Sequence, residues 1–168
     1  EKKYAWRGIL IEPILHKHFE SKIYRDPNSN KFVYGACVSE NYKSESIRLY
    51  YANLMTSPDY GKGEEYANKG KTFLSNKEEV VPIWAPALTL KSITAESNIT
   101  HIDFLSIDVE GGELEVLEGF DWTGTTVDLI LIESTRNSPA LQFLLDKGFI
   151  HLVDMINNHI FIPEIRTN

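Results

Sequence analysis

The chain has 168 residues, of which 42% are hydrophobic and 24% charged, and its formal net charge is −7. This length suits one domain, and the composition is ordinary for a soluble globular protein. The negative charge disfavours a nucleic-acid partner, and the single cysteine excludes both an internal disulfide and a cysteine-based zinc cluster. No apolar run approaches the roughly 20 residues of a membrane span, so we expect a cytoplasmic protein.

The amino-terminal part has a strand–helix–strand pattern. The apolar run 8–12 ends on an acid and reads as a strand. Leu15, Phe19 and Ile23 recur at four-residue spacing, which predicts a helix with these side chains as its buried stripe. The run 31–39 reads as a second strand. This order is typical of a parallel pair joined by a right-handed crossover.

Residues 40–80 differ in composition from the rest of the chain, with five tyrosines and several lysines. We expect a short strand at 46–51 and otherwise a long loop, which in a compact domain is typical of a lid or a mobile segment. Interleaved tyrosine and lysine would also suit stacking on nucleic acid, but the acidic charge of the chain disfavours that interpretation.

Further strands are expected at 80–84 and 102–108, with a short helix at 89–96 between them. The near-continuous apolar run 126–133 is typical of a strand buried on both faces. A helix capped by Ser138 and stopped by Gly148 should then bury Leu141, Leu144 and Leu145. Two strands, 149–155 and 159–163, should form a hairpin around Asn157-Asn158. The whole order predicts one domain, 1–168, with a doubly wound, mostly parallel α/β sheet and an antiparallel carboxyl-terminal hairpin.

Acidic residues end three of the expected strands. Ligands of open α/β sheets bind at the carboxyl ends of the strands, so these acids are the candidate site residues. Glu12 could accept hydrogen bonds from both hydroxyls of a ribose, or be a solvated acid favoured by the start of a helix. Glu133 would lie beside Asp108, where it could position a substrate or only solvate a strand end.

Asp108 and Glu110 are two residues apart, so in a continuing strand both would point to one side. Two such carboxylates can bind a divalent cation, hold a substrate hydroxyl or act as a general base. Alternatively they only complement the start of the next helix, an interpretation that suits Glu113 and Glu115 better. The glycines at 111 and 112 allow a tight turn or a close approach to a ligand. No metal site is assigned.

Taken together, these segments resemble the FkbM-like family of S-adenosylmethionine-dependent methyltransferases. The matching text is GILIEP (8–13), ACVS (36–39), the run Leu88-Thr89-Leu90, IDFLSIDVEGGELEVLEGFDW (102–122), LILIE (129–133) and LLDKGF (144–149). The resemblance implies a Rossmann-like fold. It also implies methyl transfer from S-adenosylmethionine, typically to a hydroxyl of a sugar, glycan or secondary metabolite.

The resemblance also implies roles for individual residues. Glu12 would bind the ribose, and Ala36 and Cys37 would lie near the adenine through backbone contacts. Asp108 and Glu110 would line the pocket where methyl donor and acceptor meet, with Asp108 also among the cofactor-binding residues.

One departure from the family pattern concerns its first strand and helix, with their glycine-rich loop, which should precede GILIEP. Only EKKYAWR stands there, so we expect a fragment of a longer methyltransferase that binds the cofactor weakly or not at all. The strands at 8–12 and 102–108 must then pair directly, leave a gap or be completed by another chain. The alternatives are a non-catalytic methyltransferase-like binding module and, on a similar sheet, a nicotinamide-dependent oxidoreductase. The latter requires a glycine-rich fingerprint that the sequence lacks.

Overall fold

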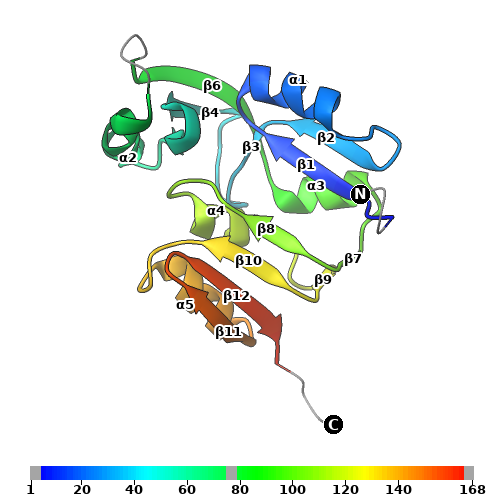
Figure 1. The fold of residues 1–168 in the computed structure, drawn as a ribbon. Coiled ribbons are helices and arrows are strands. Elements are labelled where there is room, and N and C mark those ends of the chain that lie inside the picture. The colour runs from blue at the N-terminus through cyan, green and yellow to red at the C-terminus, as the bar shows by residue number, and fades with distance from the viewer. Residues whose placement is uncertain (1–4, 75–78, 165–168) are drawn as a thin grey trace.

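The computed structural model describes residues 5–74 and 79–164, which form a mixed α/β fold with parallel and antiparallel strand pairs (Figure 1). The strands fall into four hydrogen-bonded groups, in the orders β1-β2, β3-β6-β4-β5, β7-β9 and β11-β12-β10-β8. The mixed α/β class is as expected. The single continuous sheet is not seen, because strands expected to be long are broken into shorter ones that pair with different partners.

The amino-terminal unit is the expected strand–helix–strand. β1 (Gly8–Glu12) pairs in parallel with β2 (Asn30–Tyr34), and α1 (Leu15–Tyr24) connects them. The register sets Glu12 beside Tyr34, so both strands end at the same edge.

The expected buried stripe of α1 is wrong. Leu15, Phe19 and Ile23 are 50%, 56% and 77% exposed, whereas His18 on the same helix is buried. Helical periodicity identifies an apolar face, but it does not say whether another element covers that face. Within the described residues, this face of α1 has no such cover.

The second expected strand is divided at Gly35. After β2, the chain turns away and β3 (Ala36–Cys37) pairs in parallel with the end of β6 (Val81–Leu88). A side-chain carbon at Gly35 would lie 2.7 Å from Leu88 Cδ1 and 3.0 Å from the carbonyl oxygen of Pro86, so the chain passes close to β6 at this point.

The expected long loop at 40–80 consists mostly of regular secondary structure. β4 (Ser46–Tyr51) is the predicted short strand, and it pairs antiparallel with β6 along its whole length. The other elements are η1 (Asn53–Met55), β5 (Ser57–Pro58), α2 (Gly63–Lys69) and η2 (Gly70–Phe73). Residues 75–78 of this loop lie outside the described part. We call residues 46–74 the insertion.

The expected strand at 102–108 is divided into β7 (His101–Ile102) and β8 (Leu105–Ile107), and the run 126–133 into β9 (Thr126–Val127) and β10 (Ile130–Glu133). β7 pairs with β9 and β8 with β10, in parallel both times. The hairpin of β11 (Phe149–Met155) and β12 (Asn158–Pro163) is confirmed, and β12 pairs antiparallel with β10. Its turn is Ile156-Asn157 rather than Asn157-Asn158, because Asn158 already pairs with Met155.

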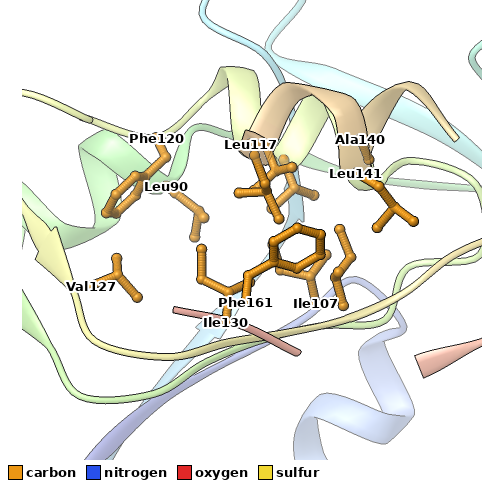
Figure 2. Close-up of a cluster of buried hydrophobic side chains, with 12 residues drawn as sticks. Leu90, Ile107, Leu117, Phe120, Val127, Ile130, Ala140, Leu141 and Phe161 are labelled. Carbon is orange, nitrogen blue, oxygen red and sulfur yellow. The ribbon is translucent and has the colours of Figure 1, made fainter. Parts of the chain in front are cut away.

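The main core lies between this carboxyl-terminal sheet and the helices α3 (Leu90–Glu96), α4 (Glu113–Glu118) and α5 (Pro139–Asp146). Figure 2 shows side chains of α4 and α5 facing those of the strands, among them Leu117, Ile130 and Phe161, all fully buried. Ser138 caps α5 as expected. Leu145, however, is 45% exposed and is not a core residue.

β1 and β8 are not hydrogen-bonded to each other, and each has one unpaired edge within the described residues. Their amino ends approach through the rings of Trp6 and Phe104, whose centroids are 6.2 Å apart. Figure 1 shows the two strands running in the same direction, with α3 behind the space between their ribbons. Within the described residues, these two strands therefore neither pair directly nor have another strand of this chain between them, and completion by another chain stays a prediction.

No helix in the described ranges has the length and apolar character needed to cross a membrane.

Candidate active site at the carboxyl ends of the strands

Three acids lie near one another where β8 and β10 end. Because β10 runs parallel to β8 with Ile132 opposite Ile107, the residues that follow, Glu133 and Asp108, are neighbours at the same edge. The charges of Asp108 and Glu133 both act on Glu110. The structure thus brings together Asp108, Glu110 and Glu133, and Glu133 lies beside Asp108 as the two strand ends predicted.

Glu110 does not continue the strand, although its spacing from Asp108 suggested it. Its φ is +52°, and the chain turns there into Gly111, with φ +101°. A non-glycine residue adopts this left-handed conformation only with local support. The hydroxyl of Ser57 provides that support by donating a 2.6 Å hydrogen bond to the carbonyl oxygen of Glu110.

The side chain of Glu110 is half-buried among other acids. Burial, followed by the charges of Asp108, Glu133 and Glu113, raises the pKa of Glu110 to about 7. The pKa of Glu133 is also raised, by burial and then by Asp108. A carboxyl with a pKa near neutral pH can accept a proton from a substrate hydroxyl more effectively than an ordinary glutamate can.

Glu113 and Glu115 stabilise the start of helix α4. Glu113 Oε1 accepts a 2.8 Å hydrogen bond from the backbone N–H of Gly111, and Glu113 and Glu115 lie in the first turn of the helix. Burial raises the pKa of both carboxyls. These contacts agree with the helix-start interpretation of the two residues.

Glu12 lies at the end of β1, apart from the acids after β8. Its Oε1 accepts a 2.7 Å hydrogen bond from the N–H of Ile14, and burial raises the pKa of the carboxyl. Its Oε2 has no hydrogen bond within the described residues, so this oxygen is available to a ligand. Next to it, at the ends of β1 and β2, is an open hollow of about 390 Å³ lined by Pro13, Ile14, Leu15, His16, Tyr34, Tyr51, Ile83 and Trp84.

Ala36 and Cys37 lie in β3, where Ala36 is buried. The hydroxyl of Tyr60 donates a 3.2 Å hydrogen bond to the carbonyl oxygen of Cys37, and burial raises the pKa of the thiol to about 12. The thiol is therefore un-ionised at neutral pH, so it is a poor nucleophile. Any contact between Cys37 and a ligand would be through the backbone.

Sequence reasoning missed the residues that the insertion contributes to this edge. Ser57 contacts the turn after β8, and Tyr60 contacts the end of β3, so the insertion is fixed to two strand ends. The only signal in the sequence was the tyrosine-rich composition of 40–80, which does not say which residues turn inward.

Three residues of metal-ligating types lie together at the opposite end of the strands. His101, Asp103 and Asp128 have ligand atoms within 4.8 Å of one another, and all three are exposed. They precede β8 and β10, at the end of the sheet opposite Asp108. Asp108 and Glu110 do not belong to such a group within the described residues.

The model of the methyltransferase FkbM domain matches residues 1–161. The search of curated proteins found no significant match. The search of solved structures found none either. A match over nearly the whole sequence is decisive for membership, and the chain belongs to the FkbM methyltransferase family.

Proposed function

We propose that the chain is the catalytic part of an S-adenosylmethionine-dependent O-methyltransferase. Its methyl acceptor would be a hydroxyl of a sugar, a glycan or a small secondary metabolite. Family membership supports methyl transfer. The observation that supports oxygen as the methylated atom is the raised pKa of Glu110. A carboxyl with a pKa of about 7 suits a base that removes the proton of an attacking hydroxyl.

The residues at the strand ends fit the methyl donor. Glu12 offers a free Oε2 and the second lone pair of Oε1 to the hydroxyls of a ribose. The hollow beside Glu12 is lined by apolar and aromatic side chains, which suit the planar base of a nucleoside. Its lining includes neither Ala36 nor Cys37, so a base bound there would not make the adenine contacts that the resemblance implies for these two residues. S-adenosylmethionine would supply an electrophilic methyl group when bound.

The work of the protein in this reaction is proton transfer and positioning. Glu110 takes the proton of the acceptor hydroxyl, and Asp108 and Glu133 keep the proton affinity of Glu110 high through their negative charges. The insertion lies on the side to which β8 and β10 point in Figure 1, where it would contact the acceptor.

Methyl transfer should depend on pH through Glu110. Because Glu110 acts as a base only when deprotonated, kcat/KM should rise tenfold per pH unit below about 7 and level off above it. Glu110→Gln should reduce kcat at least about 100-fold, the usual contribution of a general base. The measurement is transfer of radiolabelled methyl to a panel of sugars and glycans. Activity retained in Glu110→Gln would exclude this residue as the base.

Binding of the product S-adenosylhomocysteine tests the donor site separately. Glu12→Gln should weaken binding about tenfold in calorimetric titration, because one charge-assisted hydrogen bond to the ribose is lost. Glu20→Gln is the matched control, since Glu20 is an exposed acid of α1 that forms an ion pair with Lys17. Equal affinities of the two variants would remove Glu12 from the donor site.

The unpaired edges of β1 and β8 favour a second candidate, a methyltransferase-like binding module without activity. The donor and acceptor residues lie on both sides of these edges, so catalysis needs the two edges in a fixed relation. No binding of S-adenosylhomocysteine by the wild-type chain would favour this candidate.

A further inference from the structure

We propose that Ser57, in the insertion, is a positioning residue that holds Glu110 in the orientation from which it accepts a proton. This inference rests on the proposed role of Glu110 as the base. Ser57 itself does not touch the reacting atoms.

The contact between the two residues joins distant parts of the chain. They are 53 residues apart, and the Ser57 hydroxyl donates to the Glu110 carbonyl oxygen over 2.6 Å. Ser57 is only 1% exposed, so water cannot readily replace either partner of this hydrogen bond. The hydrogen bond supports the backbone of Glu110, whose φ of +52° is rare for a residue other than glycine.

The neighbouring residues fit the same surface. A side-chain carbon at Gly111 would lie 3.3 Å from the ring of Tyr66, and one at Gly112 would lie 2.8 Å from Pro58 Cγ. The insertion therefore packs against the turn over three consecutive residues, and the hydrogen bond from Ser57 is one part of a fitted contact.

The consequence for Glu110 follows from its backbone. With the carbonyl held, the side chain stays half-buried beside Asp108 and Glu133, whose charges raise its pKa. Without the hydrogen bond, φ can return to the negative region that L residues prefer, which turns the side chain toward solvent. Both burial and the repulsion by the other acids would then weaken, and the proton affinity would fall.

A purely structural role of Ser57 must be distinguished from a positioning role. Thr56 offers a matched control, because its hydroxyl donates to the Asn53 carbonyl and accepts from the Ala52 N–H, both within the insertion. Thr56→Val removes a partly buried hydroxyl from the residue next to Ser57. It leaves the contact with Glu110 in place.

The experiment is a pH titration of the Glu110 carboxyl by carbon-13 NMR in the full chain. In Ser57→Ala, the midpoint should fall by about one unit or more, a tenfold loss of proton affinity. In Thr56→Val, it should stay at the wild-type value. An unchanged midpoint in Ser57→Ala, or an equal fall in both variants, would overturn the proposal.

A second variant keeps the result decisive, and so does the independence of the titration from methyl transfer. If Ser57→Ala does not fold, Ser57→Cys keeps a weak donor of similar size, and its midpoint should lie between those of the wild type and a solvent-exposed glutamate. The titration needs neither methyl donor nor acceptor. A chain that transfers no methyl group but shows the Ser57-dependent shift would support the positioning role and remove only the proposed reaction.

Discussion

Glu110 combines an unusual backbone conformation with an unusual proton affinity, and both depend on its neighbours. Its φ is supported by Ser57, and its pKa is raised to about 7 by burial and by three other acids. Such a carboxyl lowers the stability of the fold whenever it is charged, because the unfolded chain ionises it more easily. Sites that perturb a pKa in this way are often functional.

This penalty can be measured from the pH dependence of stability. Between the ordinary pKa of 4.5 and about 7, the folded protein binds more protons at Glu110 than the unfolded chain does, so the free energy of unfolding falls as pH rises. Glu110→Gln lacks this loss. Between pH 5 and pH 8, we expect the free energy of unfolding of the variant to increase by about 1 kcal/mol relative to that of the wild type. This value allows for solvent screening of a half-exposed group.

Urea denaturation of both proteins across that range provides the test. The difference between variant and wild type should increase with pH and become constant above about 7. A difference that is independent of pH would mean that Glu110 titrates at its ordinary value.

The sequence was sufficient to locate the acids but not to orient them. Glu12, Asp108 and Glu133 were placed from apolar runs that end on an acid, a local pattern that strand pairing preserves. The orientation of Glu110 depends on Ser57, 53 residues away. No local pattern contains that contact, so the sequence does not show that Glu110 turns the chain instead of continuing the strand.

At the scale of elements, helix α4 depends on a close contact with Val38, the residue that follows β3. A side-chain carbon at Gly119, the last residue of the helix cap, would lie 2.1 Å from the carbonyl oxygen of Val38. Because that obstacle is backbone, it cannot move aside as a flexible side chain could. The glycine therefore sets the distance between the two elements.

Gly119→Ala should accordingly destabilise the protein by about 3 kcal/mol, at the upper end of the range for overpacking. Gly8→Ala is the control, because its added carbon would meet only Asn30 Oδ1 at 3.5 Å, an ordinary contact. Thermal or urea denaturation of the two variants gives the comparison. Equal stabilities would show that α4 can shift away from β3 at little cost.

Elements whose signals are local were predicted well. The cap at Ser138 and the stop at Gly148, whose φ is +84°, mark α5 correctly, and strand β4 has its predicted bounds. The rest of the insertion was read as a loop, because β5 has only two residues and takes its partner from β4. The apolar stripe of α1 shows the same limit, since its burial depends on other elements.

At the scale of the molecule, the strands that carry the two halves of the candidate site belong to separate hydrogen-bonded groups. Glu12 ends β1, whereas Asp108 follows β8, and neither strand pairs with the other. The amino-terminal ends are tied by the Trp6–Phe104 contact, at the end opposite the acids. The unpaired edges should therefore be the part of the sheet structure least protected from solvent.

Amide hydrogen exchange can resolve these edges residue by residue. The Gly8 N–H bonds toward β2 and the Leu105 N–H toward β10. Because successive N–H groups along a strand point to opposite edges, those of Ile9, Ile11 and Ser106 point to the unpaired edges. We expect their exchange by NMR to be at least 100-fold faster than that of Ile132, whose strand is paired on both sides.

Leu10 is the internal control for this experiment, since alternation directs its N–H toward β2 in the same strand as Ile9 and Ile11. If β1 merely frayed, Leu10 would exchange as fast as its two neighbours. If the edges were closed, by direct pairing or by a strand of another chain, Ile9, Ile11 and Ser106 would be as protected as Leu10. Only open edges on folded strands give the alternating pattern, in which Glu12 and Asp108 end strands that do not share a hydrogen bond.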